Sequence, residues 1–144
     1  MRRLLILLYG LLCYAVGMGG LVYFILFVGG WDFLPLHIDS RSPGDAPTAL
    51  LINAGLMLLL TLQHSAMARP RFKQAWTKVI PAAAERGTYV LFSGVVFLLI
   101  CLFWQAMPGT VWRAESPIAR GALTAVQLLG WLFVVVASFA INHF

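Results

Sequence analysis

Four apolar stretches of the chain are each long enough to cross a lipid bilayer, which takes about 20 residues in a helix. They run over residues 4–28, 49–68, 88–106 and 121–142, and connections rich in Pro, Gly, Asp and Ser separate them. The sequence therefore predicts an all-α, polytopic membrane protein. We expect a bundle of four transmembrane helices that forms one domain over residues 1–144.

The composition excludes the main alternatives to a membrane protein. Hydrophobic residues make up 61% of the chain and charged residues only 10%, whereas soluble domains average about 25% charged. A soluble domain of this size could not hide so much apolar surface. Both cysteines, Cys13 and Cys101, lie inside apolar stretches. We therefore expect neither a disulfide framework nor a metal site.

The basic residues are distributed unequally between the two sides of the predicted bundle. Seven lie at the N-terminus and in the second connection, namely Arg2, Arg3, Arg69, Arg71, Lys73, Lys78 and Arg86. The opposite side holds Arg41, Arg113 and Arg120. The positive-inside rule then places both termini in the cytoplasm. Topology also explains the net charge of +5, so we expect lipid contact and no nucleic-acid partner.

Polar side chains gather at the cytoplasmic ends of three of the four stretches. Residues 63–65 (Gln-His-Ser) and Arg69 end the second stretch, Glu85 and Arg86 precede the third, and residues 142–143 (Asn-His) end the fourth. Polar groups at membrane depth are expensive and often functional. Any chemistry is therefore expected to face the cytoplasm.

Each of these polar residues also has a plain structural interpretation, which the sequence leaves open. Asn53 lies eleven residues before His64, on nearly the same helical face, and could simply bond to a neighbouring helix. His64 could be an interfacial histidine with a satisfied ring. Arg69 could serve topology and lipid headgroups, and Glu85 could pair locally with Arg86.

Small residues in the first stretch fall near one stripe of the expected helix. The stripe includes Gly10, Gly17 and Gly20. Residues of this size let the backbones of two membrane helices approach closely. A nucleotide-binding loop is excluded here, because no strand precedes these glycines.

Four sequence blocks resemble the bacterial methanethiol S-methyltransferase family, which is similar in turn to the NnrU-like and isoprenylcysteine carboxyl methyltransferase-like membrane proteins. The blocks are QHSAMARPRF at 63–72, ERGTYVL at 85–91, PGTVW at 108–112 and SFAINHF at 138–144. The positions that match the family pattern are Gln63, His64, Arg69, Pro70, Glu85, Arg86, Tyr89, Asn142 and His143. Gly87 departs from it, because a serine is expected there. The resemblance is to the N-terminal half of the family, whose members are expected to continue into further spans that hold the cofactor pocket.

The resemblance implies a multi-pass enzyme of the bacterial inner membrane that transfers a methyl group from S-adenosylmethionine to a small thiol, so that methanethiol becomes dimethyl sulfide. Under that hypothesis His64 or Glu85 takes the thiol proton. Arg69 or Arg86 favours the thiolate or the cofactor carboxylate. The pair 142–143 (Asn-His) is assigned to cofactor binding. Without the second half of the family the chain could be inactive alone, and a separate chain would then supply that half.

Two other classes of function stay open at this point. Four short-looped helices also suit a non-catalytic subunit packed against a larger membrane complex. His64 and His143, on two helices at similar depth, could instead ligate a haem. A stoichiometric partner would favour the first alternative and a Soret band the second.

Overall fold

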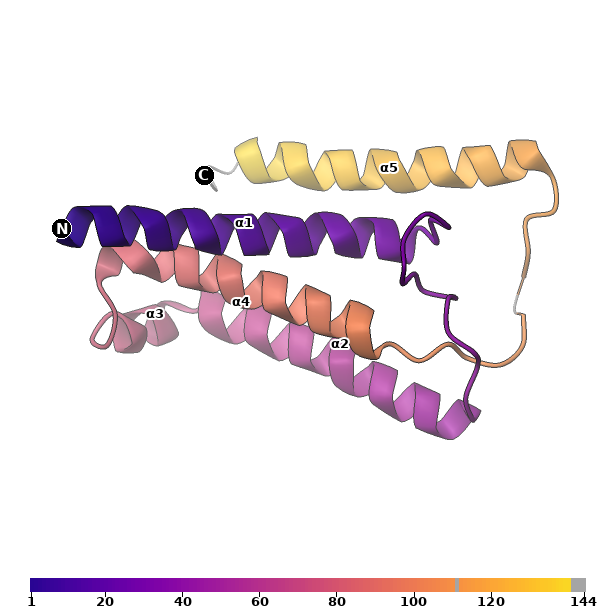
Figure 1. Cartoon of the computed structure of the whole chain (residues 1–144), viewed down its shortest axis with the longest axis horizontal. Helices are drawn as coiled ribbons and strands as arrows, with labels where there is room; N and C mark the ends of the chain where they lie inside the picture. Colours follow the sequence, from indigo (N-terminus) through magenta and orange to yellow (C-terminus); the bar gives the residue numbers. More distant parts are fainter. Residues whose placement is uncertain (111, 141–144) are drawn as a thin grey trace. The chain divides into compact units, whose positions relative to one another are not determined.

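The computed structural model describes residues 1–110 and 112–140, apart from the side chains of Arg2, Ser138 and Phe139. The described residues contain no strand and form α1 (Arg2–Val28), α2 (Ala46–Ala68), α3 (Pro70–Trp76), α4 (Ala82–Phe103) and α5 (Pro117–Ala140) (Figure 1). Of these helices, α1, α2, α4 and α5 are long and apolar enough to cross a membrane. The predicted class, an all-α multi-pass membrane protein, is confirmed. The orientation of the termini stays a prediction.

The chain divides into two compact units, Met1–Pro108 and Gly109–Phe144. In the first unit α4 packs against both α1 and α2, and the short α3 contacts α2 (Figure 1). The second unit holds α5. At one end of the first unit α2 stops, α3 lies and α4 starts. We call this end of the unit the α3 end. The organisation as a single domain stays a prediction.

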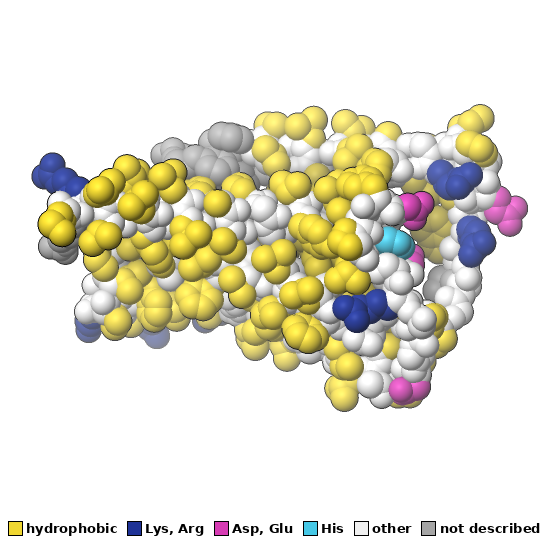
Figure 2. Space-filling view, viewed as in Figure 1, with side chains coloured by type: hydrophobic (Ala, Val, Ile, Leu, Met, Phe, Trp, Pro, Cys, Tyr) yellow, Lys and Arg dark blue, Asp and Glu magenta, His cyan; other side chains and the backbone are white. Residues whose placement is uncertain are grey.

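Large apolar side chains cover the outer surface of the spanning helices. Figure 2 shows hydrophobic side chains along the length of the helices, while the charged side chains visible on this face lie toward helix ends and connections. Leu4, Leu8 and Leu11 on α1 and Leu51 and Leu62 on α2 are all exposed. In water this surface would be strongly unfavourable, so it marks the contact with lipid.

α1 and α4 approach each other most closely where both carry glycine. A Cβ atom added at Gly94 would lie 2.5 Å from the Cα of Gly17, and one added at Gly20 would lie 2.6 Å from the carbonyl oxygen of Gly94. Further along the same contact the rings of Phe24 and Phe97 stack with centroids 4.8 Å apart. The close approach expected from the first glycine stripe is therefore confirmed at Gly17 and Gly20, whereas a Cβ atom at Gly10 would meet nothing within 4 Å.

At the end of the first unit opposite α3, polar side chains form hydrogen bonds between the helices and their connections. The Asn53 amide donates to the carbonyl oxygen of Gln105 at 2.8 Å and accepts from its N–H at 2.9 Å. Arg41 donates to the carbonyl oxygen of Leu102 at 2.6 Å, which satisfies one of the unpaired carbonyls at the C-terminus of α4. Asn53 is buried and therefore has the structural role that the sequence left open for it.

Asp45 is the N-cap residue of α2 and defines where the helix starts. The Asp45 carboxylate accepts the backbone N–H of Thr48 at 3.0 Å, and this hydrogen bond lowers the pKa of Asp45. The capped helix is thus favoured above the ordinary pKa of an aspartate, and the contribution is lost as the pH falls through the lowered value.

Several boundaries differ from the sequence prediction, and two of the differences affect the placement of candidate site residues. The second connection contains a short helix, α3, because Pro70 suits the first position of a helix while the preceding Arg69 stays extended. The helix predicted to start at residue 88 starts at Ala82 instead, since three alanines follow Pro81 and favour helix. Glu85 and Arg86 consequently lie inside α4, and not in the connection before it.

We expect Gly94→Ala to destabilise the packing of α1 on α4 by about 1–3 kcal/mol, because the new methyl group meets the backbone of α1. Thermal unfolding of the purified chain in detergent measures the effect. Gly55→Ala on α2 is the matched control, since a Cβ atom there meets nothing within 4 Å. Equal midpoints for the two variants would contradict the close α1–α4 contact.

Candidate functional site

One face of α4 carries polar side chains toward α2 and α3. Glu85, Tyr89 and Ser93 are spaced four residues apart, and residues at this spacing lie on the same side of a helix. Each of the three contacts a residue of α2 or α3. We call this contact region, with its partners Gln63, His64 and Lys73, the polar seam.

Gln63 and Ser93 form the deepest link of the polar seam. The Gln63 Nε2 amide donates to the Ser93 hydroxyl at 3.3 Å and contacts the sulfur of Met67 at 3.4 Å. Ser93 in turn donates its proton to the carbonyl oxygen of Tyr89 at 3.0 Å. The Gln63 Oε1 atom is buried and has no hydrogen-bond partner among the described residues. It is therefore an unsatisfied acceptor inside the polar seam.

His64 lies one residue further along α2, against the ring of Tyr89. The two ring centroids are 5.3 Å apart with an angle of 52° between the ring planes. The His64 side chain is nevertheless exposed. An imidazole with one side held by an aromatic ring and the other open can exchange protons with a small substrate.

Glu85 and Lys73 connect the start of α4 to α3. The Lys73 Nζ lies 3.8 Å from the Glu85 Oε1, and the Glu85 side chain is only 19% exposed while that of Lys73 is 49% exposed. The geometry depends on α3, because the extended Arg69 and the helix start at Pro70 turn the chain at the end of α2 and place Lys73 near the start of α4. The sequence did not indicate Lys73 as a partner of Glu85.

Of the four residues that sequence analysis assigned to catalysis, two lie in the polar seam and two lie outside it. His64 and Glu85 belong to the polar seam through Tyr89 and Lys73. Arg69 lies exposed between α2 and α3, and Arg86 lies exposed on α4; no described contact joins either guanidinium to His64. The predicted cofactor-binding residues, 142–143, lie outside the described residues. The proposed haem ligand His143 is one of them.

Ser93 and Lys73 are the members of the seam that the sequence interpretation missed, and Tyr89 was named only as a position that matches the family pattern, without a role. The spacing of Tyr89 and Ser93 from Glu85, four and eight residues, was a usable signal for a shared face. Lys73 could not be found in this way, because its position relative to Glu85 depends on how α3 is placed after α2.

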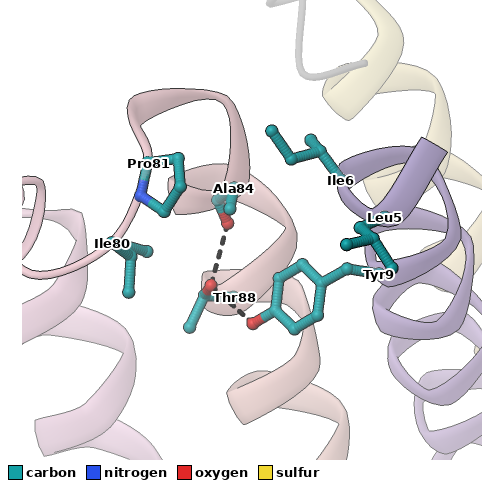
Figure 3. Close-up of a pocket in the computed structure, with 7 residues that line it drawn as sticks. All are labelled: Leu5, Ile6, Tyr9, Ile80, Pro81, Ala84 and Thr88. Carbon is teal, nitrogen blue, oxygen red and sulfur yellow. Dashed lines mark hydrogen bonds between the residues drawn. The ribbon is translucent and has the colours of Figure 1, made fainter. Parts of the chain in front are cut away.

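A cavity of about 340 Å³ lies on the neighbouring side of α4, toward α1. It is lined by Leu5, Ile6, Tyr9, Ile80, Pro81, Ala84 and Thr88 (Figure 3). The Tyr9 hydroxyl and Thr88 Oγ1 are 2.8 Å apart and join α1 to α4 at its base. We call this cavity the α1–α4 groove.

Comparison with known proteins identifies relatives over the whole chain. The chain is 41% identical over 144 residues to the methanethiol S-methyltransferase of Crocosphaera subtropica, covering 100% of this chain and 56% of the relative. It is 44% identical over 138 residues to that of Pseudomonas deceptionensis, covering 96% and 52%. It is 38% identical over 144 residues to that of Mycobacterium tuberculosis, covering 100% and 59%. The chain is similar to methanethiol S-methyltransferases over all of its 144 residues.

The resemblance inferred from the four sequence blocks is thereby confirmed. The chain spans about half the length of the curated methanethiol S-methyltransferases it matches. No protein-family model matches the chain, and no solved structure matches it. The polar seam holds groups suited to proton transfer, namely the His64 imidazole and the Glu85 carboxylate.

We expect Lys73 and Glu85 to be energetically coupled. A double-mutant cycle of Lys73→Met and Glu85→Gln, measured by thermal unfolding in detergent, should give a coupling energy of about 0.5 kcal/mol, since the lysine is half exposed. Lys78→Met with Glu85→Gln is the control cycle and should give none. Strict additivity in the first cycle would show that the pair does not hold α3 to α4.

Proposed function

We propose that this chain forms the thiol-handling part of a bacterial inner-membrane enzyme that methylates a small thiol, such as methanethiol, with S-adenosylmethionine as donor. The observation that carries the proposal is the pairing of His64 with Tyr89 beside the Glu85–Lys73 ion pair, at one end of helices whose surfaces are otherwise apolar. The similarity to methanethiol S-methyltransferases supplies the reaction class.

His64 is the proposed proton acceptor. A small alkyl thiol is mostly protonated at neutral pH, since it is no more acidic than a free cysteine, whose thiol pKa is about 8.5, and the thiolate is the stronger nucleophile. The open side of the His64 imidazole can take the S–H proton at a ring nitrogen while Tyr89 holds the ring from the other side. Glu85 does not contact the thiol. Through its ion pair with Lys73 it holds α3 in place near His64.

The polar groups at the α3 end fit the charged end of S-adenosylmethionine. The Glu85–Lys73 pair presents one charge of each sign, which matches an amino-acid ammonium and carboxylate. The buried Gln63 Oε1 offers a further acceptor. Arg69 is the proposed second anchor for the carboxylate, which is one of the alternatives that the sequence hypothesis left open for Arg69 and Arg86. When bound, the cofactor supplies an electrophilic methyl group, and the chain's own contribution is to orient and deprotonate the thiol.

The decisive experiment measures transfer of labelled methyl groups from S-adenosylmethionine to methanethiol in lipid. The chain is assayed alone and after co-expression with the part of the Crocosphaera relative that it does not match. We expect labelled dimethyl sulfide in at least one of the two preparations. His64→Ala should lower the rate by about 10²–10⁴-fold, and Glu85→Gln by a smaller factor.

His37→Ala is the matched control, because His37 lies in the connection between α1 and α2, at the opposite end of the unit. It should leave the rate unchanged. Transfer that survives both His64→Ala and Glu85→Gln would remove the proposed roles. A lack of product in both preparations, with the intact relative active, would favour the non-catalytic subunit.

We also propose that the α3 end faces the cytoplasm, from the distribution of basic residues. With a membrane-impermeant maleimide, Ser40→Cys should be labelled in intact cells and Lys78→Cys only after permeabilisation. The native cysteines, Cys13 and Cys101, are buried and give a low background. The reverse pattern of labelling would invert the proposed topology.

A further inference from the structure

The α1–α4 groove has apolar walls and a polar base. Leu5, Ile6, Ile80, Pro81 and Ala84 present carbon atoms to it, and the two hydroxyl-bearing side chains meet at its base (Figure 3). Its volume of about 340 Å³ lies at the lower end of the range for small-molecule sites, about 300–1,000 Å³. Such a site selects an apolar ligand with one polar group.

The hydrogen bonds at the base of the groove have a fixed direction. Thr88 donates its only hydroxyl proton to the carbonyl oxygen of Ala84 at 2.8 Å. Thr88 Oγ1 must therefore accept in its 2.8 Å hydrogen bond with Tyr9, and the Tyr9 O–H donates to it. The Cys13 thiol also lies beside the Tyr9 hydroxyl, one turn further along α1.

Because its own proton is committed to Thr88, the Tyr9 oxygen acts toward a ligand only as an acceptor. A ligand that carries a donor on a small apolar body is favoured. An anion is disfavoured, because it would lose its hydration and face another acceptor. Of the two sulfur compounds in the proposed reaction, the neutral thiol has an S–H donor, whereas the methylated sulfide has none.

The groove is placed to receive its ligand from the bilayer. Leu4 and Leu5 beside it on α1 are exposed on the lipid-facing surface, and a small neutral thiol partitions readily into lipid. Thr88, at the base of the groove, is adjacent in α4 to Tyr89 of the polar seam, so the two sites differ in depth by only about one residue rise of 1.5 Å.

We propose that the α1–α4 groove is an intake site that binds the small neutral thiol through its S–H group and holds the methylated sulfide more weakly. This inference rests on the proposed function for the identity of the ligand. The groove holds the protonated thiol close to the depth of His64, and loss of the donor on methylation removes the one polar contact that the groove offers.

Ligand-observed NMR on the chain in lipid nanodiscs tests the proposal, with methanethiol and dimethyl sulfide as probes. We expect methanethiol to bind about two- to tenfold more tightly than dimethyl sulfide, the ratio that one hydrogen bond provides. Tyr9→Phe should remove this preference. Ile6→Trp should fill the groove and abolish the binding of both probes, whereas Leu12→Trp, at an exposed position of α1 outside the groove lining, should not.

Equal binding of the two probes to the unmodified chain, or methanethiol binding that survives Ile6→Trp, would overturn the proposal. The Ile6→Trp variant keeps the test valid if Tyr9→Phe does not fold. The readout is separate from methyl transfer. Preferential thiol binding in a chain that never yields product would sustain the thiol-selective groove and refute the proposed enzyme, whereas methyl transfer without groove binding would do the opposite.

Discussion

The close approach of α1 and α4 is the contact on which the rest of the first unit depends. Gly17 and Gly20 on α1 and Gly94 on α4 let the two backbones meet where any side chain would collide. In lipid, apolar side chains gain little by leaving the solvent, so packing of this kind and interhelical hydrogen bonds must hold the helices. The Tyr9–Thr88 bond toward one end and the Phe24–Phe97 stack then fix the register.

α4 is consequently held on two sides, and its first two turns present two chemically different faces. Toward α1, Ala84 and Thr88 help form a groove that is apolar except for two hydroxyls. Toward α2 and α3, Glu85 and Tyr89 form part of a seam that holds an ion pair and an imidazole. A polar group at membrane depth must be paired or useful. The proposed division of labour assigns the neutral thiol to the first face and its deprotonation to the second.

The polar residues of α2 differ in role according to their position along the helix. Asn53 is buried and bonds the backbone of Gln105 in both directions, which gives it a structural role. Gln63, ten residues later, keeps a buried acceptor without a partner among the described residues, and His64 keeps one side of its ring open. The two kinds of residue looked alike in the sequence, because both are polar groups in an apolar helix.

The sequence by itself determined the class of the protein and the reaction worth testing. Apolar stretches of spanning length, the unequal distribution of basic residues and four blocks of family-like sequence are local properties that need no tertiary information. It also indicated the close glycine contact, since small residues at helical spacing have one common use in membranes. The sequence did not predict α3, whose seven residues are too few for a clear periodic pattern. For the same reason it did not predict the Lys73–Glu85 pair.

Only the tertiary structure decided which polar residues meet. Helical spacing places Glu85, Tyr89 and Ser93 on one face, but it does not say that His64 and Gln63 lie opposite them. That depends on the crossing of α2 with α4, which side-chain packing fixes. The α1–α4 groove was likewise invisible in the sequence, because Leu5, Ile6 and Tyr9 come together with residues 80–88 only when the glycine contact has brought α1 against α4.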